Sequence, residues 1–280
     1  MSKIMLLKKF RFSSYFFSVL SLFIIQTASA LEIIGEWQQG AVIVGKVPSD
    51  TTVVYNERTL QLTPKGQFVL GLGRDAGAVA IITTITNGVT EQHTFDVKPR
   101  TYNIQRVEGV PQKTIEPSKE QTERIKKEAL LTSGARKTEL PLDFFTQKFQ
   151  WPVIGPISGV YGSQRIYNGI PGSPHVGVDI AKPEGTMVHA PAGGVVTLAH
   201  NDMFLSGGTL IIDHGHGLSS TFIHLSKILV KKGDNIIQGQ NIALIGKTGR
   251  ASGPHLHWAM NWFTERVDPQ LLVADMPKGK

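Results

Sequence analysis

Histidines are concentrated in one stretch of the 280-residue chain. Eight of the nine lie between His175 and His257, and only His93 lies outside that stretch. Imidazole nitrogens bind transition metals and exchange protons near neutral pH. The chain has no cysteine, which excludes disulfides, thiolate zinc sites and a cysteine nucleophile. A metal in this protein would therefore be held by His, Asp or Glu side chains.

The segment His175-Val-Gly-Val-Asp179 alternates polar and apolar residues. The spacing of its His and Asp would also suit one face of a helix, but two β-branched valines around Gly177 disfavour a helix. We therefore predict a strand over residues 175–179. In a strand, His175 and Asp179 share one face while the valines point to the other.

A second alternation lies at His255-Leu256-His257, where Leu256, Trp258 and Met260 are predicted to point into the core. Both imidazoles then face one cleft. Two histidines and one carboxylate form a nitrogen and oxygen ligand set that suits zinc and leaves a fourth tetrahedral position open. An open zinc site is typical of hydrolytic enzymes.

Three ordered motifs resemble one known family. They are Ser173-Pro-His175-x-Gly-x-Asp179, Ser219-Ser-Thr-Phe-Ile-His224-Leu225 and Ser252-Gly-Pro-His255-Leu-His257. They are similar to the motifs of the lysostaphin and LytM-type zinc endopeptidases of peptidoglycan, and the resemblance covers roughly residues 151–272. It implies an antiparallel β-sheet metallopeptidase domain, which we place at residues 138–280.

Carried over to this chain, the resemblance makes His175, Asp179 and His257 the ligands of one Zn²⁺ per chain. It makes His224 and His255 the catalytic histidines. One imidazole would take a proton from the attacking water and the other would stabilise the oxyanion or protonate the leaving amine. The sequence does not assign these two roles.

The chain departs from the family pattern at two places. Relatives commonly have Tyr where this chain has Phe222, so a hydroxyl group is missing there. Many also have a carboxylate shortly after the second alternation, where Ala259 and Met260 follow here. A hydrogen-bond partner for a metal-bound imidazole is therefore expected from elsewhere in the fold.

The other histidines of the cluster are not predicted to bind metal. His189 and His200 flank a glycine-rich hairpin. His214 and His216 lie in Asp213-His-Gly-His-Gly217, where the glycines favour a turn over strand alternation.

The chain upstream of this domain is β-rich. Residues 31–106 contain short β-prone runs at 41–44, 51–55, 67–72, 79–86 and 89–97, and Asn87-Gly88 is a two-residue hairpin signal. We predict a small antiparallel β-sandwich, similar to the N-terminal module of periplasmic members of the family, with a positioning or binding role. The whole chain is therefore assigned to the all-β class.

A polar linker is predicted at residues 107–137. Ser118-x-x-Gln121 is a capping box that opens a charged, solvated spacer helix, and Gly134 is the predicted C-cap.

In the C-terminal domain, residues 184–196 and 232–245 look like distant copies of one turn unit. Lipoyl and biotinyl carrier domains use similar hairpins, but the tip Ala192-Gly193-Gly194 lacks the lysine that carriers modify.

Residues 162–172 are predicted to form one wall of the substrate groove. Within this segment, Arg165 is either a surface residue or a contact for a substrate carboxylate.

Residues 1–30 have the pattern of a secretory signal. Four basic residues precede an apolar run over 15–25, and Ala28-Ser-Ala30 is a small-residue cleavage site. The apolar run is too short for a stable membrane anchor. The formal net charge of +7 falls to +3 without this segment, which does not indicate nucleic-acid binding. We therefore expect a periplasmic or secreted protein.

The preferred hypothesis is a zinc-dependent endopeptidase that acts on the peptide stems and cross-links of peptidoglycan. One alternative is a non-catalytic LytM-like regulator that binds and activates a cell-wall amidase; such proteins usually lose metal-site residues, and all five positions are intact here. A wall-binding module with a structural metal is a third possibility, which the open three-ligand set disfavours.

Overall fold

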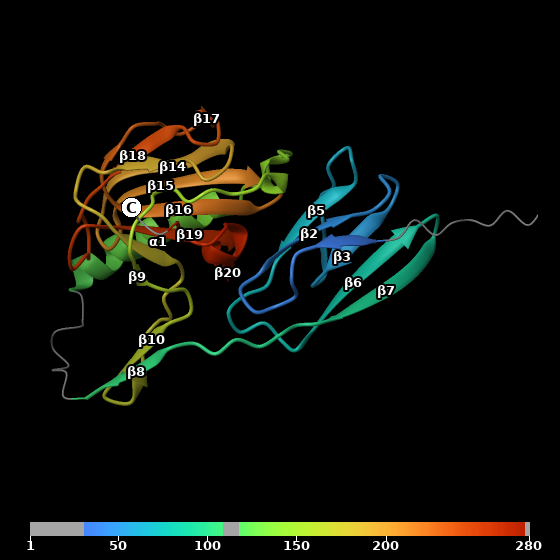
Figure 1. The fold of residues 1–280 in the computed structure, drawn as a ribbon, viewed down its shortest axis with the longest axis horizontal. Helices are drawn as coiled ribbons and strands as arrows, with labels where there is room; N and C mark the ends of the chain where they lie inside the picture. Colours follow the sequence, from blue (N-terminus) through green and yellow to red (C-terminus); the bar gives the residue numbers. More distant parts are fainter. Residues whose placement is uncertain (1–30, 109–117, 278–280) are drawn as a thin grey trace, which may run out of the picture.

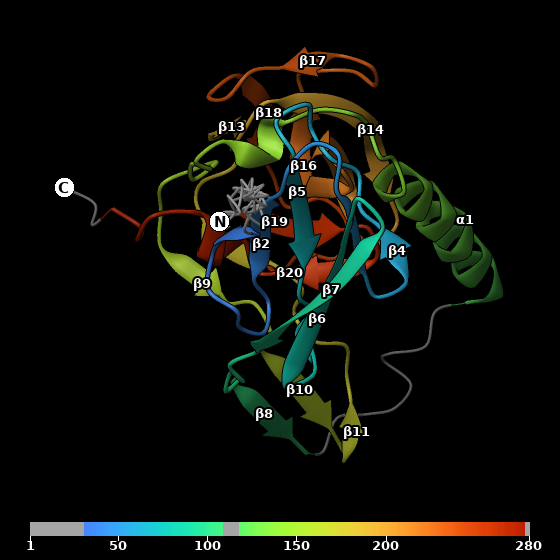
Figure 2. The same cartoon turned by 90° about the vertical axis from the view of Figure 1, so that its right-hand side faces the viewer.

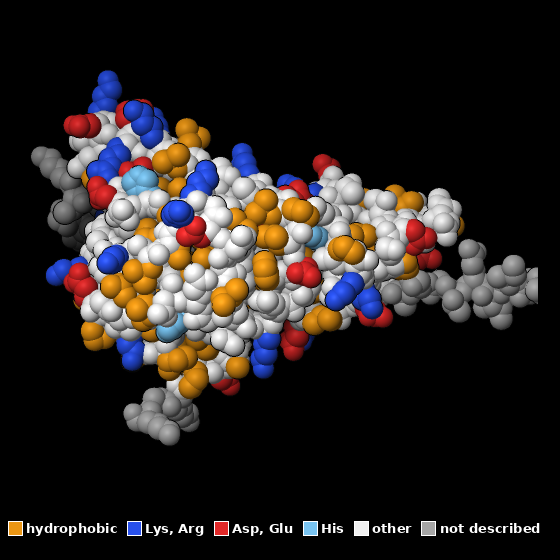
Figure 3. All heavy atoms as spheres, turned by 90° about the horizontal axis from the view of Figure 1, so that it is seen from above, with side chains coloured by type: hydrophobic (Ala, Val, Ile, Leu, Met, Phe, Trp, Pro, Cys, Tyr) orange, Lys and Arg blue, Asp and Glu red, His pale blue; other side chains and the backbone are white. Residues whose placement is uncertain are grey.

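The computed structural model describes residues 31–108 and 118–277. It consists of two β-rich parts, with the N-terminal strands beside one end of the larger C-terminal sheet (Figure 1). The predicted signal at residues 1–30 lies outside the described residues. None of the helices in the described ranges has the length and apolar character that a membrane span requires. On the face in Figure 3, basic and acidic side chains are interspersed.

The N-terminal part is the antiparallel sandwich that the sequence predicts. One sheet has the order β1-β2-β5 and the other β4-β3-β6-β7. Asn87 and Gly88, at φ 52° and 77°, form the predicted tight turn between β6 and β7. Ile43, Phe68 and Ile82 from the two sheets are fully buried in the core. The strands are β1 Glu32–Ile34, β2 Val42–Lys46, β3 Thr52–Tyr55, β4 Arg58–Thr59, β5 Gln67–Gly71, β6 Val79–Thr86 and β7 Val89–Asp96.

The C-terminal part is built on one large antiparallel sheet with the order β17-β14-β15-β16-β19-β12-β9. The all-β class and the antiparallel sheet are therefore confirmed. Its elements are η2 Phe144–Thr146, β9 Ile157–Gly159, β12 Val178–Ala181, β13 Met187–His189, β14 Gly194–Met203, β15 Gly207–Gly215, β16 Leu218–Ile228, β17 Asn235–Ile236, β18 Asn241–Ile245, β19 His255–Trp262, β20 Glu265–Val267 and η3 Pro269–Leu272.

The two similar turn units pair with each other. Strand β13 of the first unit pairs with β18 of the second, and β14 of the first pairs with β17 of the second. The two units are therefore joined to each other through two strand pairs.

Helix α1 (Lys119–Arg136) begins as predicted and ends differently. Ser118 is the N-cap, and its side chain and that of Gln121 form the capping box. Gly134 lies inside the helix and Lys137 is the C-cap, so the predicted glycine cap is wrong. The helix continues because its last turn packs on the sheet, where Ala135 is buried.

The helix also differs from the predicted free spacer, because it lies along the C-terminal sheet (Figure 2). Arg124 binds the carboxylate of Asp202, and Glu128 accepts a hydrogen bond from the Phe204 amide at 2.8 Å. Most of its other side chains are exposed, as expected of a charged run.

Strand β8 (Ile104–Val107) joins the C-terminal part. It pairs in parallel with β10 (Gln164–Tyr167), which forms a hairpin with β11 (Ile170–Pro171). The end of the predicted sandwich module therefore shares a small sheet with the predicted groove wall. The boundaries at residues 31–106, 107–137 and 138–280 stay a prediction.

The sandwich contacts the end of the β19–β20 hairpin. Arg100 forms an ion pair of 2.8 Å with Asp268, whose side chain is 1% exposed. The guanidinium of Arg58 lies 3.8 Å from the centre of the Phe263 ring. Gly71 lies so close to Trp262 that a Cβ atom would clash with the indole side chain. These contacts fix the sandwich beside the sheet that carries the histidines.

Candidate metal centre

Asp179 and His257 lie on adjacent core strands. They are register partners in the antiparallel pair β12–β19, so both side chains point to the same face of the sheet. Their neighbours Ile180 and Leu256 are fully buried on the opposite face. Oδ1 of Asp179 lies 2.7 Å from Nδ1 of His257. The local alternation thus positions this pair as the sequence predicts.

His175 reaches the same point from a loop. The predicted strand over 175–179 begins only at Val178. The backbone of His175 instead exchanges hydrogen bonds with Gly162 and Ser163, outside any strand of the sheet. At Gly177 a Cβ atom would clash with the carbonyl oxygen of Trp258 and crowd the His257 ring, so glycine permits the close approach. Nε2 of His175 lies 3.1 Å from Oδ1 of Asp179.

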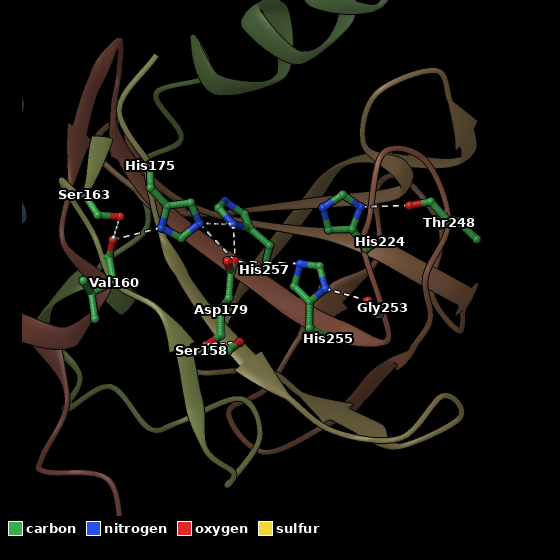
Figure 4. A network of polar contacts seen from close by, with 10 residues as sticks. All are labelled: Ser158, Val160, Ser163, His175, Asp179, His224, Thr248, Gly253, His255 and His257. Carbon is green, nitrogen blue, oxygen red and sulfur yellow. Dashed lines mark hydrogen bonds and ion pairs between the residues drawn. The ribbon is translucent and has the colours of Figure 1, made fainter. Parts of the chain in front are cut away.

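Together these three residues form a group that could hold a metal ion. Ligand atoms of His175, Asp179 and His257 all lie within 4.8 Å of one another (Figure 4). It is the only such group of three or more His, Asp or Glu residues within residues 31–108 and 118–277. Two imidazole nitrogens and one carboxylate oxygen fit zinc by their chemistry.

The charge states of the ligands suit cation binding. Burial opposes ionisation of Asp179, but hydrogen bonds from His175 and His257 outweigh it and lower the pKa of the carboxyl. Burial lowers the pKa of His257, which favours the neutral, ligating imidazole. Burial also acts on His175, yet its hydrogen bond to Asp179 raises its pKa overall. A bound cation would displace that proton.

His224 and His255 lie beside this group, with Nε2 of His255 at 3.9 Å from Oδ1 of Asp179. The two rings are 4.8 Å apart, and the His224 ring is 6.4 Å from that of His257. His255 shares the face of His257 because the two are separated by one residue in β19. The structure therefore brings all five predicted residues together, and their individual roles stay predictions.

His224 has an unusual backbone. Ile223 is the register partner of His257, so simple alternation would turn His224 toward the opposite face with Phe222. Its φ of 64° lies in the left-handed region, which a histidine adopts at an energetic cost. This conformation directs the imidazole to the metal-site face. Burial lowers the pKa of His224, so the ring is neutral at neutral pH.

Backbone carbonyls orient three of the imidazoles, and sequence analysis missed them. Nδ1 of His175 donates to the Val160 carbonyl at 3.0 Å, and Nδ1 of His224 donates to that of Thr248 at 2.8 Å. Nδ1 of His255 donates to the Gly253 carbonyl at 2.8 Å. A carbonyl only accepts, so each neutral ring keeps its lone pair on Nε2. Every residue has a backbone carbonyl, so residue types do not reveal which carbonyl binds a histidine. The sequence therefore indicates only that the imidazoles need hydrogen-bond partners from elsewhere in the fold.

The remaining histidines of the cluster lie apart from the group. His214 is fully buried in strand β15, where it forms hydrogen bonds with the Gly193 carbonyl and the Ser220 hydroxyl. The turn predicted to include His214 begins later, at His216. His216 packs against Phe145. His189 lies on β13 and His200 on β14. These strands pair with β18 and with β15 and β17, not with each other, so the predicted hairpin between the two histidines is wrong.

A cavity of about 350 Å³ opens beside His175. Its lining combines the sandwich loop at Arg74 with Tyr161, Glu265 and Arg266 of the C-terminal part. Arg74 donates to the Gly162 carbonyl at 3.0 Å, so the loop is tied to the start of segment 162–172. Arg165, on β10, is exposed and bonds Gln105. The role of this segment as groove wall stays a prediction.

Comparison with known proteins agrees with this geometry. The model of Peptidase family M23 matches residues 173–269. Peptidoglycan DD-endopeptidase ShyA of Vibrio cholerae is 46% identical over 88 residues, which is 31% of this chain and 20% of ShyA. ShyB of the same organism is 40% identical over 107 residues, 38% of this chain and 24% of ShyB.

One solved structure matches most of the fold. A Pseudomonas aeruginosa protein assigned to peptidase M23 superposes with a TM-score of 0.67 and 28% identity, over 85% of this chain and 96% of that one. The chain spans about a fifth to a quarter of the length of the two curated relatives. Both the motifs and the fold that carries them thus agree with one family, and residues 173–269 form a Peptidase family M23 domain.

Proposed function

We propose that this protein is a zinc-dependent endopeptidase that hydrolyses peptide cross-links of bacterial peptidoglycan. The observation that carries the proposal is the convergence of His175, Asp179 and His257, with two further imidazoles beside them. The domain's membership of a peptidase family and the names of ShyA and ShyB as peptidoglycan DD-endopeptidases support it.

In this proposal His175, Asp179 and His257 hold one Zn²⁺, which when bound supplies Lewis acidity and activates water at neutral pH. Asp179 contributes the negative charge of the ligand set and stays ionised because its pKa is lowered. The Val160 carbonyl holds His175 in the tautomer whose Nε2 can act as a ligand.

His224 and His255 move the protons. Each donates Nδ1–H to a backbone carbonyl, so each Nε2 can accept a proton from the attacking water or, once protonated, donate to the oxyanion or the leaving amine. The buried, neutral His224 is suited to the base role, because its lowered pKa keeps it unprotonated. His255 then serves as the donor.

The setting of the reaction follows from the same proposal. A peptidoglycan hydrolase must be exported, and the basic start, apolar run and Ala-x-Ala site at residues 1–30 supply a signal for the periplasm. The regulator alternative is not favoured, because the named relatives are hydrolases and all five site residues are present.

One experiment tests the function. Purified protein is loaded with zinc and incubated with cross-linked muropeptides, with and without chelator, and the products are identified by mass. We expect loss of cross-linked dimers and their replacement by monomers, abolished by the chelator. Intact dimers across several cross-link types would contradict the proposal.

A further inference from the structure

Two arginines without an acidic partner lie close together on the C-terminal part. Arg136 is the last residue of α1 and Arg266 lies in β20. Within the described ranges neither guanidinium forms an ion pair. Burial lowers the pKa of Arg136 to about 9, and the nearby positive charge of Arg266 contributes to that shift. Both side chains are partly buried, and keeping two such cations together is costly unless an anion joins them.

The pair lies on the sheet face that carries the metal group. Arg266 is the register partner of Asn261, and Asn261 is the register partner of Ser219, so these three side chains form a row across β20, β19 and β16. Asn261 follows His257 by four residues and therefore shares its face. The side chain of Arg136 approaches the neighbouring position on this face, Thr221, at 3.4 Å.

Hydrogen-bond donors predominate around this row. Nη1 of Arg266 donates to Oδ1 of Asn261 at 3.1 Å. The amide nitrogen Nδ2 of Asn261 has no hydrogen-bond partner, although the residue is only 1% exposed. The hydroxyl of Ser219 is also buried and unpartnered. Buried donors that lack an acceptor are costly, so the arrangement favours an anion as its missing partner.

The nearest carboxylate of the row does not pair with the arginines, although its Oδ2 atom is buried without a hydrogen-bond partner. Asp213 is the register partner of Ser219, one strand further from the arginines. It accepts a hydrogen bond from the Gly215 amide at 2.8 Å and interacts with Thr138 and Leu140. No ion pair joins it to either arginine within the described residues. The anion that would satisfy the arginines must therefore come from outside this row.

The arginines are within reach of a peptide bound at the metal group. Thr221 pairs with Ala259, two residues from His257, so Thr221 and His257 are diagonal neighbours at about 7–8 Å. Arg266 also lines the cavity that extends to His175. One or two residues of an extended peptide span this distance, since a strand rises about 3.3 Å per residue.

We propose that Arg136 and Arg266 form a subsite that binds a free carboxylate of the peptide substrate next to the scissile bond. This inference rests on the proposed function, whose substrates are peptide stems that carry free carboxylates. Paired guanidiniums bind carboxylates with charge-assisted hydrogen bonds, and Asn261 and Ser219 provide further donors. The subsite selects acidic stems over amidated ones.

The test compares acid and amide forms of one substrate. The zinc-loaded full chain is assayed with a cross-linked peptide dimer, with the same dimer amidated at its internal carboxylate, and with the dimer amidated at its C-terminus. We expect one amidation to lower kcat/KM by roughly 10- to 100-fold, the amount that a charge-assisted hydrogen bond confers. The amidation that does so identifies which carboxylate is bound.

Arg136→Gln and Arg266→Gln should then remove the preference by slowing cleavage of the acid form and not of the amide form. Arg136→Lys should retain part of it, and Lys127→Gln, at an exposed site on the same helix, should retain all of it. Zinc content and circular dichroism verify that each variant folds.

Equal cleavage of all three substrates by the wild-type protein would overturn the subsite, whatever the variants do. So would an unchanged preference in both glutamine variants. Failure of the wild-type protein to cleave any dimer would instead contradict the proposed function, so the two failures are distinguishable.

Discussion

Asp179 and His257 face each other directly across the β12–β19 ladder, with 2.7 Å between Oδ1 and Nδ1. Both strands bury their alternate residues completely, so the core fixes the backbone positions of both residues. Two of the three proposed ligands are therefore placed opposite each other before any metal binds. The third, His175, is held by the Val160 carbonyl. Such preorganisation lowers the cost of binding a cation.

The first prediction concerns the ligand set. His175→Ala, Asp179→Ala and His257→Ala should each weaken zinc binding by more than about 100-fold, since even a residue that only orients a ligand is worth 10- to 100-fold. Metal analysis and competition with a chromogenic chelator measure the loss. His214→Ala is the matched control, because His214 lies in the second His-x-His pair and bonds only Gly193 and Ser220. Equal loss of zinc from this control would contradict the assignment.

The parts predicted correctly from the sequence are those with a local signal. Alternation placed Leu256, Trp258 and Met260 in the core, and Asn87-Gly88 marked the β6–β7 turn. The capping box at Ser118 marked the start of α1. In each case the residues that carry the signal are those that make the contacts.

The parts that escaped prediction depend on contacts between distant segments. Glycine is common just after the end of a helix, so Gly134 is a plausible C-cap by residue type. Burial of Ala135 nevertheless extends α1 beyond it. Alternation in β16 would turn His224 away from the metal group, and its left-handed backbone reverses that direction. The Ser206 carbonyl accepts the His224 amide at 2.8 Å in place of a regular ladder partner. No local pattern encodes such contacts.

A second prediction concerns pH and stability. Burial lowers the pKa of His214 from 6.5 to about 4. Between these values the unfolded state binds a proton that the folded state excludes, so stability is complete above about pH 6.5 and falls as the pH decreases toward 4. The loss at His214 should be about 2–3 kcal/mol. Urea unfolding from pH 7 to pH 4 measures it, and His214→Asn should have a shallower dependence than the wild-type protein. Parallel curves would contradict the prediction.

A third prediction concerns the junction between the two parts. Arg100→Met removes the cationic partner of Asp268, a carboxyl whose pKa is already raised by burial. The free energy of unfolding should fall by about 1–3 kcal/mol, which is the cost of a lost partner for a buried polar group. Chemical denaturation checks this value. Lys98→Met is the control, because its ion pair with Glu36 is exposed on both sides and should contribute little.

The same junction bears on whether residues 138–280, the predicted metallopeptidase domain, fold and bind zinc without the sandwich. That fragment lacks α1 and leaves Asp268 without Arg100. Residues 118–280 also lack Arg100 but keep α1 on β14 and β15, so we expect the shorter fragment to be the less stable of the two. Thermal unfolding of the two fragments compares them. Failure of both to fold would mean that the sandwich is part of the catalytic core.

The last prediction separates chemistry from metal binding. His224→Ala and His255→Ala should leave zinc near stoichiometric, since neither residue belongs to the three-residue group. Turnover should nevertheless fall by about 10²- to 10³-fold, the usual contribution of one proton-transfer or oxyanion group. Zinc analysis and muropeptide assays on the same preparations measure both quantities.

The pH profile adds a test of which imidazole is the base. Because burial lowers the pKa of His224, the acidic limb of kcat/KM should lie below the pKa of an ordinary histidine. In His224→Ala that limb should disappear from the residual activity, whereas in His255→Ala it should remain. Full activity in His224→Ala would contradict the mechanism, and loss of the acidic limb only in His255→Ala would exchange the two roles.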